Sequence, residues 1–261
     1  MAADGDRGVN GVRLSDIASV ATAAAVAIAL VLVFIPDGTA SAPPRPIDAP
    51  SLRLPPAEQG PPTALFIGDS YTAGRGPREL SPSCLAASRL GWLCHLSAVP
   101  GTGYVSGGPS NRFTVDEYRG ESTSFAERIP LLAKQFDPDV VVLDGGRNDQ
   151  FPPRANVLAA MVATIGEARR AWPEAEIVFE RPRFLSRPDD DLGFDDSFTN
   201  RLLRDPAARG VSVIDPIRAF DGRDTSSLLT DDGVHPNRQG ELDLAAQITA
   251  SLVDQRFTAN A

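Results

Sequence analysis

Short apolar segments alternate with longer helical segments along most of the chain, and this alternation constrains the fold more than any other feature. The expected strands are residues 64–67, 92–98, 140–143, 177–179 and 211–214. The expected helices are residues 82–90, 125–136, 157–171, 198–209 and 238–254. Because strands that alternate with helices form right-handed βαβ units, the sequence predicts an α/β fold, a three-layer α/β/α sandwich with a five-stranded parallel sheet.

The first 62 residues differ in composition from the rest of the chain. Residues 17–35 are apolar apart from Ser19 and Thr22. At about 1.5 Å of rise per residue, a helix of this length nearly crosses the hydrocarbon core of a bilayer. The run is longer than the hydrophobic part of a cleaved signal peptide, which reaches about 15 residues. We therefore expect a transmembrane anchor, with a signal segment cleaved after the small residues 40–42 as the alternative.

The anchor or signal separates the chain into a tail, a linker and a domain. Arginines in residues 1–16 favour a cytoplasmic N-terminal tail, so the rest is extracytoplasmic, either membrane-anchored or secreted. Residues 36–62 contain three proline pairs and should form an extended linker, because proline fixes φ and lacks a backbone N–H. Residues 63–257 are long enough for one domain with a single core, followed by a C-terminal tail at 258–261.

The charge pattern argues against nucleic acid as a partner. The formal net charge is -9, from 25 basic and 34 acidic residues. The basic residues form no stripe that could follow a phosphate backbone.

The chain has two cysteines, Cys84 and Cys94. Because an even number of cysteines in an exported chain indicates a disulfide, we expect these two to be bonded, with two buried free thiols as the alternative. The cysteines and His95 lack a convincing fourth ligand, so the sequence predicts no metal site.

Four polar turns punctuated by glycine follow the expected strands or precede the last helix. They are residues 68–71, 100–103, 145–149 and 232–237. In doubly wound sheets, ligands bind beyond the carboxyl ends of the strands, so these turns should meet at one edge. Together they supply a hydroxyl, an imidazole, a carboxylate, an amide and glycine N–H groups.

This set of groups is what acyl transfer requires. Ser70 is the expected nucleophile, and His235 is the expected base that takes its proton. Asp232, three residues before His235, should hold the imidazole in one tautomer, and the neighbouring Asp231 is the alternative. The oxyanion of the tetrahedral intermediate needs fixed donors, which the N–H groups of Ser70 and Gly101 and the side-chain amide of Asn148 would provide.

The four turns resemble the sequence blocks of the SGNH (GDSL) hydrolases, which are named after serine, glycine, asparagine and histidine. The G-D-S block ends at Ser70, and the second-block glycine matches Gly101, with Gly103 as a competing alignment. The G-x-N-D block contains Asn148, and the D-x-x-H block ends at His235. Residue 72 is threonine, so the G-x-S-x-G elbow of the α/β-hydrolases is missing.

The resemblance covers nearly the whole expected domain. It implies the flavodoxin-like SGNH hydrolase fold and an exported bacterial esterase or lipase that hydrolyses carboxylic esters through an acyl-serine, without a cofactor. The expected substrate is an ester on a lipid or an acylated glycan. A cell-envelope O-acyltransferase that uses the same acyl-serine is the alternative. A non-catalytic binding module is a third interpretation, against which the presence of all four blocks argues.

Other residues near the four blocks carry expectations of their own. Tyr71 stands where the family usually has leucine, and it should shape the pocket or pack. Arg147 should contact an anionic or sugar part of the substrate or point to solvent. Asp69 and Asp149 should be structural. Two irregular stretches should form loops that set specificity, residues 103–124 and 181–196.

Overall fold

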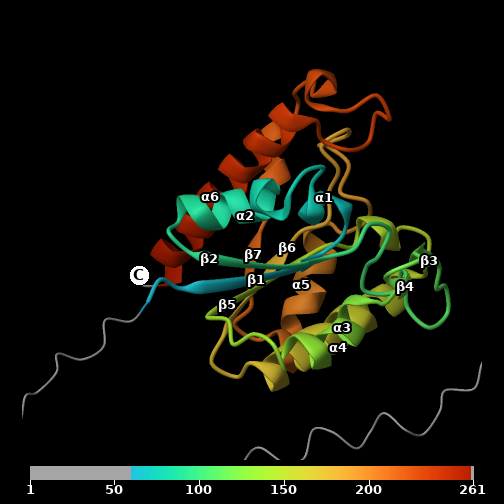
Figure 1. The fold of residues 1–261 in the computed structure, drawn as a ribbon, viewed down its shortest axis with the longest axis vertical. Coiled ribbons are helices and arrows are strands. Elements are labelled where there is room, and N and C mark those ends of the chain that lie inside the picture. The colour runs from blue at the N-terminus through green and yellow to red at the C-terminus, as the bar shows by residue number, and fades with distance from the viewer. Residues whose placement is uncertain (1–59, 260–261) are drawn as a thin grey trace, which may run out of the picture. The chain divides into compact units, whose positions relative to one another are not determined.

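The domain is built on a sheet of five parallel strands (Figure 1). The structure is a computed structural model that describes residues 60–259, and their side chains as far as residue 255. The strands are β1 (Thr63–Gly68), β2 (Leu93–Ala98), β5 (Val140–Asp144), β6 (Glu176–Glu180) and β7 (Ser212–Ile214). Their order is β2-β1-β5-β6-β7, and every neighbouring pair is parallel. The expected α/β fold is confirmed, with each strand at its expected place.

The order of the strands creates a switch point between β1 and β5. From β1 the chain moves to β2 on one side, and then crosses to β5 on the other side of β1. In open parallel sheets, ligands bind beyond the carboxyl ends of the strands at such a point. Ser70 follows β1 and Asn148 follows β5, so two of the four predicted turns lie at this switch point.

Helices cover both faces of the sheet (Figure 1). On one face lie α2 (Pro82–Arg89) and α6 (Arg238–Ala259). On the other lie α3 (Phe125–Leu132), α4 (Arg154–Ala171) and α5 (Asp196–Arg204). Because successive strand residues point to opposite faces, Phe66 packs in the core under α2 and α6, whereas Leu65 and Ile67 pack in the core under α3 and α4.

Two expected helices are shorter than predicted. The helix expected over residues 198–209 is α5, which ends at Arg204 and is followed by the 3-10 turn η3 (Pro206–Ala208). Pro206 has no N–H and its ring clashes with a preceding helical turn, so the α-helix stops before it. The helix expected over 125–136 is α3, after which residues 133–136 form hydrogen-bonded turns.

Further short helices are α1 (Ser70–Ala73), η1 (Arg78–Leu80), η2 (Arg147–Asp149), η4 (Pro216–Phe220) and η5 (Ser226–Leu228).

The stretch 103–124, expected to be irregular, contains a small antiparallel hairpin. Its strands are β3 (Thr114–Asp116) and β4 (Gly120–Glu121), seen to the right of the sheet in Figure 1. The Asp116 carboxylate accepts the backbone N–H groups of Tyr118 and Arg119, at 2.9 and 2.7 Å, and so closes the turn between the strands.

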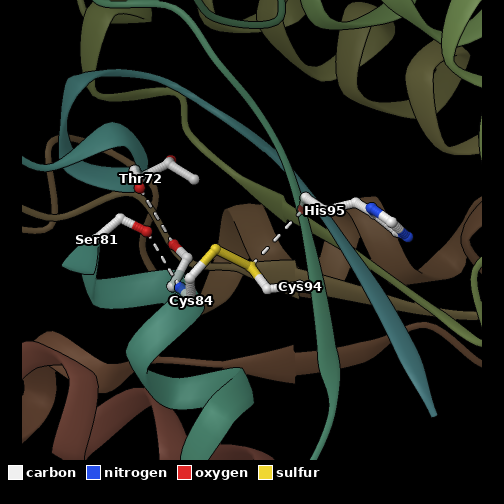
Figure 2. The surroundings of a disulfide bond; sticks show 6 residues. Thr72, Ser81, Cys84, Cys94 and His95 are labelled. Carbon is white, nitrogen blue, oxygen red and sulfur yellow. Dashed lines mark hydrogen bonds between the residues drawn. A yellow bond between two sulfur atoms is a disulfide. The ribbon is translucent and has the colours of Figure 1, made fainter. Parts of the chain in front are cut away.

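A disulfide joins Cys84 of α2 to Cys94 of β2, with 5.3 Å between the two Cα atoms (Figure 2). Ser81 begins α2 by accepting the Cys84 N–H at 3.1 Å, and Pro82 occupies the first helical position, where its missing N–H costs nothing. The bond therefore ties the start of a helix to the edge strand beside it. By loop-closure entropy, a loop of this length stabilises the fold by about 2.8 kcal/mol.

The expected N-terminal tail and anchor lie outside the described residues, as does nearly all of the expected linker. Within residues 60–259, no helix has both the length and the apolar character needed to cross a bilayer. Helix α6 continues to Ala259, into the tail expected from residue 258.

Candidate active site

Ser70 is the first residue of α1, a single helical turn that begins directly after β1. The carboxylate of Asp69 accepts the Tyr71 N–H at 2.9 Å, and the Asp69 N–H donates to the Thr72 hydroxyl at 3.1 Å. This reciprocal capping box fixes the turn that presents the serine. A Cβ at Gly68 would lie 2.6 Å from the carbonyl oxygen of Asp144, so only glycine fits at the approach to this turn.

Ser70, His235 and Asp232 form a continuous hydrogen-bonded chain. The Ser70 Oγ lies 3.0 Å from His235 Nε2, and His235 Nδ1 lies 2.7 Å from Asp232 Oδ2. An ionised Asp232 places the ring proton on Nδ1, which leaves the Nε2 lone pair free to accept the serine hydroxyl. The expected D-x-x-H pairing is what the structure shows, and the ring bonds to Asp232 rather than to Asp231.

Local hydrogen bonds hold Asp232 in its charged form. Its carboxylate accepts the backbone N–H groups of His235 and Val234, at 2.9 and 2.8 Å, and the Thr230 hydroxyl at 2.8 Å. These bonds, the His235 N–H first among them, lower the pKa of Asp232 well below its usual value. The side chains of His235 and Asp232 are 35% and 44% exposed, so the site is open to solvent on this side.

Tyr71 packs rather than lining a pocket. It is buried, and its hydroxyl donates to the carbonyl of Val234 at 2.6 Å and accepts the Leu185 N–H at 3.2 Å. Burial raises the pKa of Tyr71, so the hydroxyl keeps its proton. Tyr71, which follows Ser70, is therefore hydrogen-bonded to Val234, which precedes His235.

Asn148 lies in η2, immediately after β5. Its Nδ2 donates to the carbonyl of Thr102 at 2.9 Å and lies 3.4 Å from a carboxylate oxygen of Asp69. The first bond is short and the second is long, so one amide hydrogen is held firmly and the other only weakly. The weakly held hydrogen is the one available to an oxyanion beside Ser70.

The two candidate glycines of the second block differ in what their N–H groups do. The Gly103 N–H donates to the carbonyl of Ser106 at 2.9 Å. The Gly101 N–H has no acceptor among the described residues. Gly101 has a φ of +78°, which side-chain-bearing residues rarely adopt. The geometry favours Gly101 over Gly103 as the donor.

The expectations for Arg147 were wrong, because it contacts neither solvent nor an open substrate site. It is 2% exposed, and its guanidinium lies 2.6 Å from Asp144, 3.2 Å from Glu180 and 3.7 Å from Asp69. Its charge also lies 4.6 Å from the centre of the Tyr71 ring. Arg147 is thus the counter-ion of three buried carboxyl groups beneath the nucleophile turn.

Burial has the largest effect on the pKa values of Asp69 and Glu180 in this carboxyl cluster. It raises the pKa of Asp69 to about 6, with the neighbouring Asp144 adding to the effect and Arg147 opposing it. It also raises the pKa of Glu180 well above the usual value. One guanidinium cannot balance three buried negative charges, so the cluster retains a proton more readily than free carboxyl groups do.

Asp149 has a structural role, because its carboxylate holds the residues that follow the second block. Its carboxylate accepts the backbone N–H groups of Tyr104, Val105 and Ser106, at 2.8, 3.2 and 2.8 Å. It therefore fastens the stretch after the second block to the turn that carries Asn148.

Sequence reasoning missed several buried charged residues near the site, among them Arg128, Asp144 and Glu180. A charged residue in a helix or at a strand end usually marks a solvated position. The one available signal for Arg128 was its spacing of three residues from Phe125, which places it on the apolar face of α3.

Within residues 60–259, no cluster of three or more His, Cys, Asp or Glu side chains is arranged to hold a metal ion. The four turns bring together a hydroxyl, an imidazole, an amide and backbone N–H donors. Groups of these kinds can attack a carbonyl and stabilise the resulting oxyanion.

The sequence profile of the GDSL-like lipase/acylhydrolase family matches residues 66–241. No curated protein sequence matches the chain. Among solved structures, Est24, a carbohydrate acetylesterase from Sinorhizobium meliloti, superposes with a TM-score of 0.54 at 16% identity, over 74% of this chain and 99% of its own. The esterase EstA from Pseudoalteromonas sp., inhibited by monoethylphosphonate, gives 0.54 at 18% identity, over 74% and 97%. A family two carbohydrate esterase from Clostridium thermocellum, in complex with cellohexaose, gives 0.55 at 22%, over 75% and 65%.

Proposed function

The chain belongs to the GDSL-like lipase/acylhydrolase family and is a carboxylic-ester hydrolase, and we propose that it acts through an acyl-serine intermediate on Ser70. The hydrogen-bonded chain from Ser70 Oγ to His235 Nε2 and from His235 Nδ1 to Asp232, at 3.0 and 2.7 Å, is the observation that carries the proposal. These distances are within reach of direct proton transfer.

In the first half of the reaction, His235 Nε2 takes the Ser70 proton while the serine Oγ attacks the ester carbonyl carbon. The carbonyl π electrons move onto oxygen, and a tetrahedral intermediate forms. The imidazolium that results is stabilised by ionised Asp232 at Nδ1. Collapse of the intermediate breaks the bond to the alcohol oxygen, which leaves with the proton from Nε2.

In the second half, water takes the place of the alcohol. His235 removes a proton from the water, whose oxygen attacks the acyl-serine carbonyl. The second tetrahedral intermediate collapses to the carboxylic acid, and the proton on Nε2 returns to Ser70 Oγ. In this proposal, the N–H groups of Ser70 and Gly101 and the Asn148 amide bind the negative charge of both intermediates. Loss of one such donor typically costs about 2.7–4 kcal/mol of transition-state stabilisation.

The openness of the site also leaves room for a different acceptor in the second half-reaction. His235 and Asp232 are partly exposed, so this side of the site is accessible to an acceptor other than water. We therefore keep a cell-envelope O-acyltransferase as the alternative. Product analysis with acceptor glycans present distinguishes the two, since hydrolysis alone across a broad acceptor panel rules out transfer.

We propose an ester on an acylated glycan or a lipid as the natural substrate, and a location outside the cytoplasm. The location is supported by the apolar run at residues 17–35. It is also supported by the disulfide between Cys84 and Cys94, because disulfides persist in oxidising compartments. Two of the structures with the same fold are described as carbohydrate esterases, which agrees with a glycan ester. Cell fractionation with protease accessibility tests the location.

The decisive test of the chemistry compares the parent enzyme with Ser70→Ala on p-nitrophenyl acetate and butyrate. The proposal expects the variant to fold, because Ser70 begins a turn held by Asp69, and to lose hydrolysis. A folded Ser70→Ala enzyme with parent activity rules the proposal out.

A further inference from the structure

Arg128, on the buried face of α3, reaches the carboxyl ends of β1 and β2. Its Nη1 donates to the carbonyls of Ser97 and Gly68, at 2.8 and 3.2 Å, and its Nη2 donates to the Thr102 hydroxyl at 2.7 Å. The residue is 8% exposed and lies 4.8 Å from the centre of the Phe125 ring. One guanidinium therefore joins the end of the nucleophile strand to the turn of the second block.

Through its hydrogen bonds, Thr102 links Arg128 to two of the proposed oxyanion donors. Its hydroxyl accepts from Arg128 and donates to the Val99 carbonyl at 2.7 Å, which fixes the turn containing Gly101. Its own carbonyl accepts the Asn148 amide at 2.9 Å. The conformation of Thr102 thus sets both the direction of the Gly101 N–H and the position of Asn148.

The charge of Arg128 has no carboxylate counter-ion within 4.0 Å among the described residues, whereas Arg147 and Arg183 each have at least two. The charged groups that face it are Asp69 and Glu127, both beyond ion-pair distance. Burial lowers the pKa of Arg128 to about 10, so it remains protonated at neutral pH. Arg128 is thus a buried charge held by three hydrogen bonds to neutral oxygens rather than by a direct ion pair.

We infer that Arg128 is a positioning residue for the oxyanion hole, acting through Thr102 to hold Gly101 and Asn148 against Ser70. The inference rests on the proposed function, because it needs an oxyanion to form beside Ser70. It predicts that losing Arg128 affects the transition state more than substrate binding, since Gly101 and Asn148 bind the charge that develops during attack.

The main variant is Arg128→Met, which keeps an unbranched apolar stem and removes the guanidinium with its donors. Because it misplaces donors without deleting them, we expect kcat for p-nitrophenyl acetate to fall about 10- to 100-fold, less than the full loss of a donor, with KM within about threefold of the parent. The matched control is Arg169→Met. Arg169 also donates to two backbone carbonyls, those of Ala207 and Arg209, but from α4 and away from the four turns. It should keep kcat within about twofold of the parent.

Arg128→Lys provides a readout that a purely structural role would not change. A lysine has an ordinary pKa of about 10.4, and burial lowers it, so the ammonium loses its charge as the pH becomes alkaline. We expect Arg128→Lys to recover part of kcat at neutral pH and to show a new alkaline loss of kcat that the parent lacks.

The outcomes separate the inference from the function on which it rests. A folded Arg128→Met enzyme with parent kcat overturns the inference, while an inactive parent, or an active Ser70→Ala variant, overturns the proposed function and the inference with it. If Arg128→Met fails to fold, the variant Thr102→Val tests the inference instead. It keeps Arg128 and the shape of the Thr102 side chain but removes the hydroxyl that accepts from Arg128. We expect kcat to fall about fivefold or more in Thr102→Val, and Thr102→Ser to restore it. Parent kcat in Thr102→Val contradicts the inference.

Discussion

The hydroxyl of Tyr71 donates to the backbone carbonyl of Val234 at 2.6 Å, which joins the nucleophile turn to the histidine loop through the residues next to Ser70 and His235. The two loops are separated by more than 160 residues in the sequence, so this bond fixes the relative positions of groups that no local structure holds together. A pair of groups that must exchange a proton at 3.0 Å depends on such a connection.

Tyr71→Phe should therefore lower activity without removing any proposed catalytic group. The change deletes the bond to Val234 and leaves the buried Leu185 N–H without its recorded partner, at a cost of about 1–3 kcal/mol in the free energy of unfolding. We expect kcat to fall about tenfold with little change in KM, because the loop holding His235 loses its anchor. Steady-state kinetics and urea unfolding measure the two effects. Parent kcat in a destabilised variant would show that the bond serves stability alone.

Arg147→Met should be strongly destabilising at neutral pH, because it leaves Asp69, Asp144 and Glu180 buried without a counter-ion. Removing one partner of a buried ion pair typically costs about 3–5 kcal/mol. The deficit should shrink towards acid pH, because burial raises the pKa values of Asp69 and Glu180 and these two groups become neutral there. Urea unfolding at several pH values tests this, with Arg170→Met, which removes an exposed pair with Glu167, as the control. A deficit that is independent of pH contradicts the counter-ion role.

Asp69→Asn should change how stability depends on pH. The folded pKa of Asp69 is raised from 3.8 to about 6, so the folded state binds this proton more tightly than the unfolded state does. The resulting stabilisation is fully present below the unfolded pKa of 3.8 and is lost as the pH rises through about 6. Relative to Asp69→Asn, the parent should gain about 2 kcal/mol when the pH falls from 7 to 4. Equal pH slopes in the two proteins would exclude a raised pKa at Asp69.

Removal of the disulfide should affect stability and leave the chemistry intact. Cys84 and Cys94 join α2 to the edge strand β2, and neither takes part in the hydrogen-bonded chain formed by Ser70, His235 and Asp232. The double variant Cys84→Ser/Cys94→Ser should lose about 2–4 kcal/mol in the free energy of unfolding and keep the parent kcat at 25 °C. Thermal unfolding of the oxidised parent, the reduced parent and the variant provides the comparison. A large fall in kcat in the folded variant would place the disulfide within the active-site framework.

The elements that could be predicted from sequence share a local signal. The five strands are short apolar runs, and each of the four turns contains a glycine, so both the sheet and the edge that carries Ser70 and His235 follow from pattern alone. The spacing of Asp232 and His235 also predicts their contact, since three residues in a turn bring the two side chains together.

The parts that could not be predicted depend on contacts between distant segments. Arg147 appears in the sequence as an ordinary polar residue beside Asn148, and only the fold reveals the three carboxyl groups that surround it. Arg128 is a similar case, because its acceptors come from β1, β2 and the second block. Pro206 in the sequence marks the early end of α5, but Gly210, a typical residue after a helix C-terminus, favours one longer helix to residue 209.

The most direct test of the central claim is mass spectrometry of the enzyme after reaction with a fluorophosphonate, which forms a stable bond with an activated serine. The account predicts one phosphonyl group on Ser70, loss of labelling in Ser70→Ala, and labelling slowed at least about 100-fold in His235→Ala, because the base that accepts the Ser70 proton is gone. Labelling of a different residue, or an unlabelled enzyme that still hydrolyses esters, would contradict it.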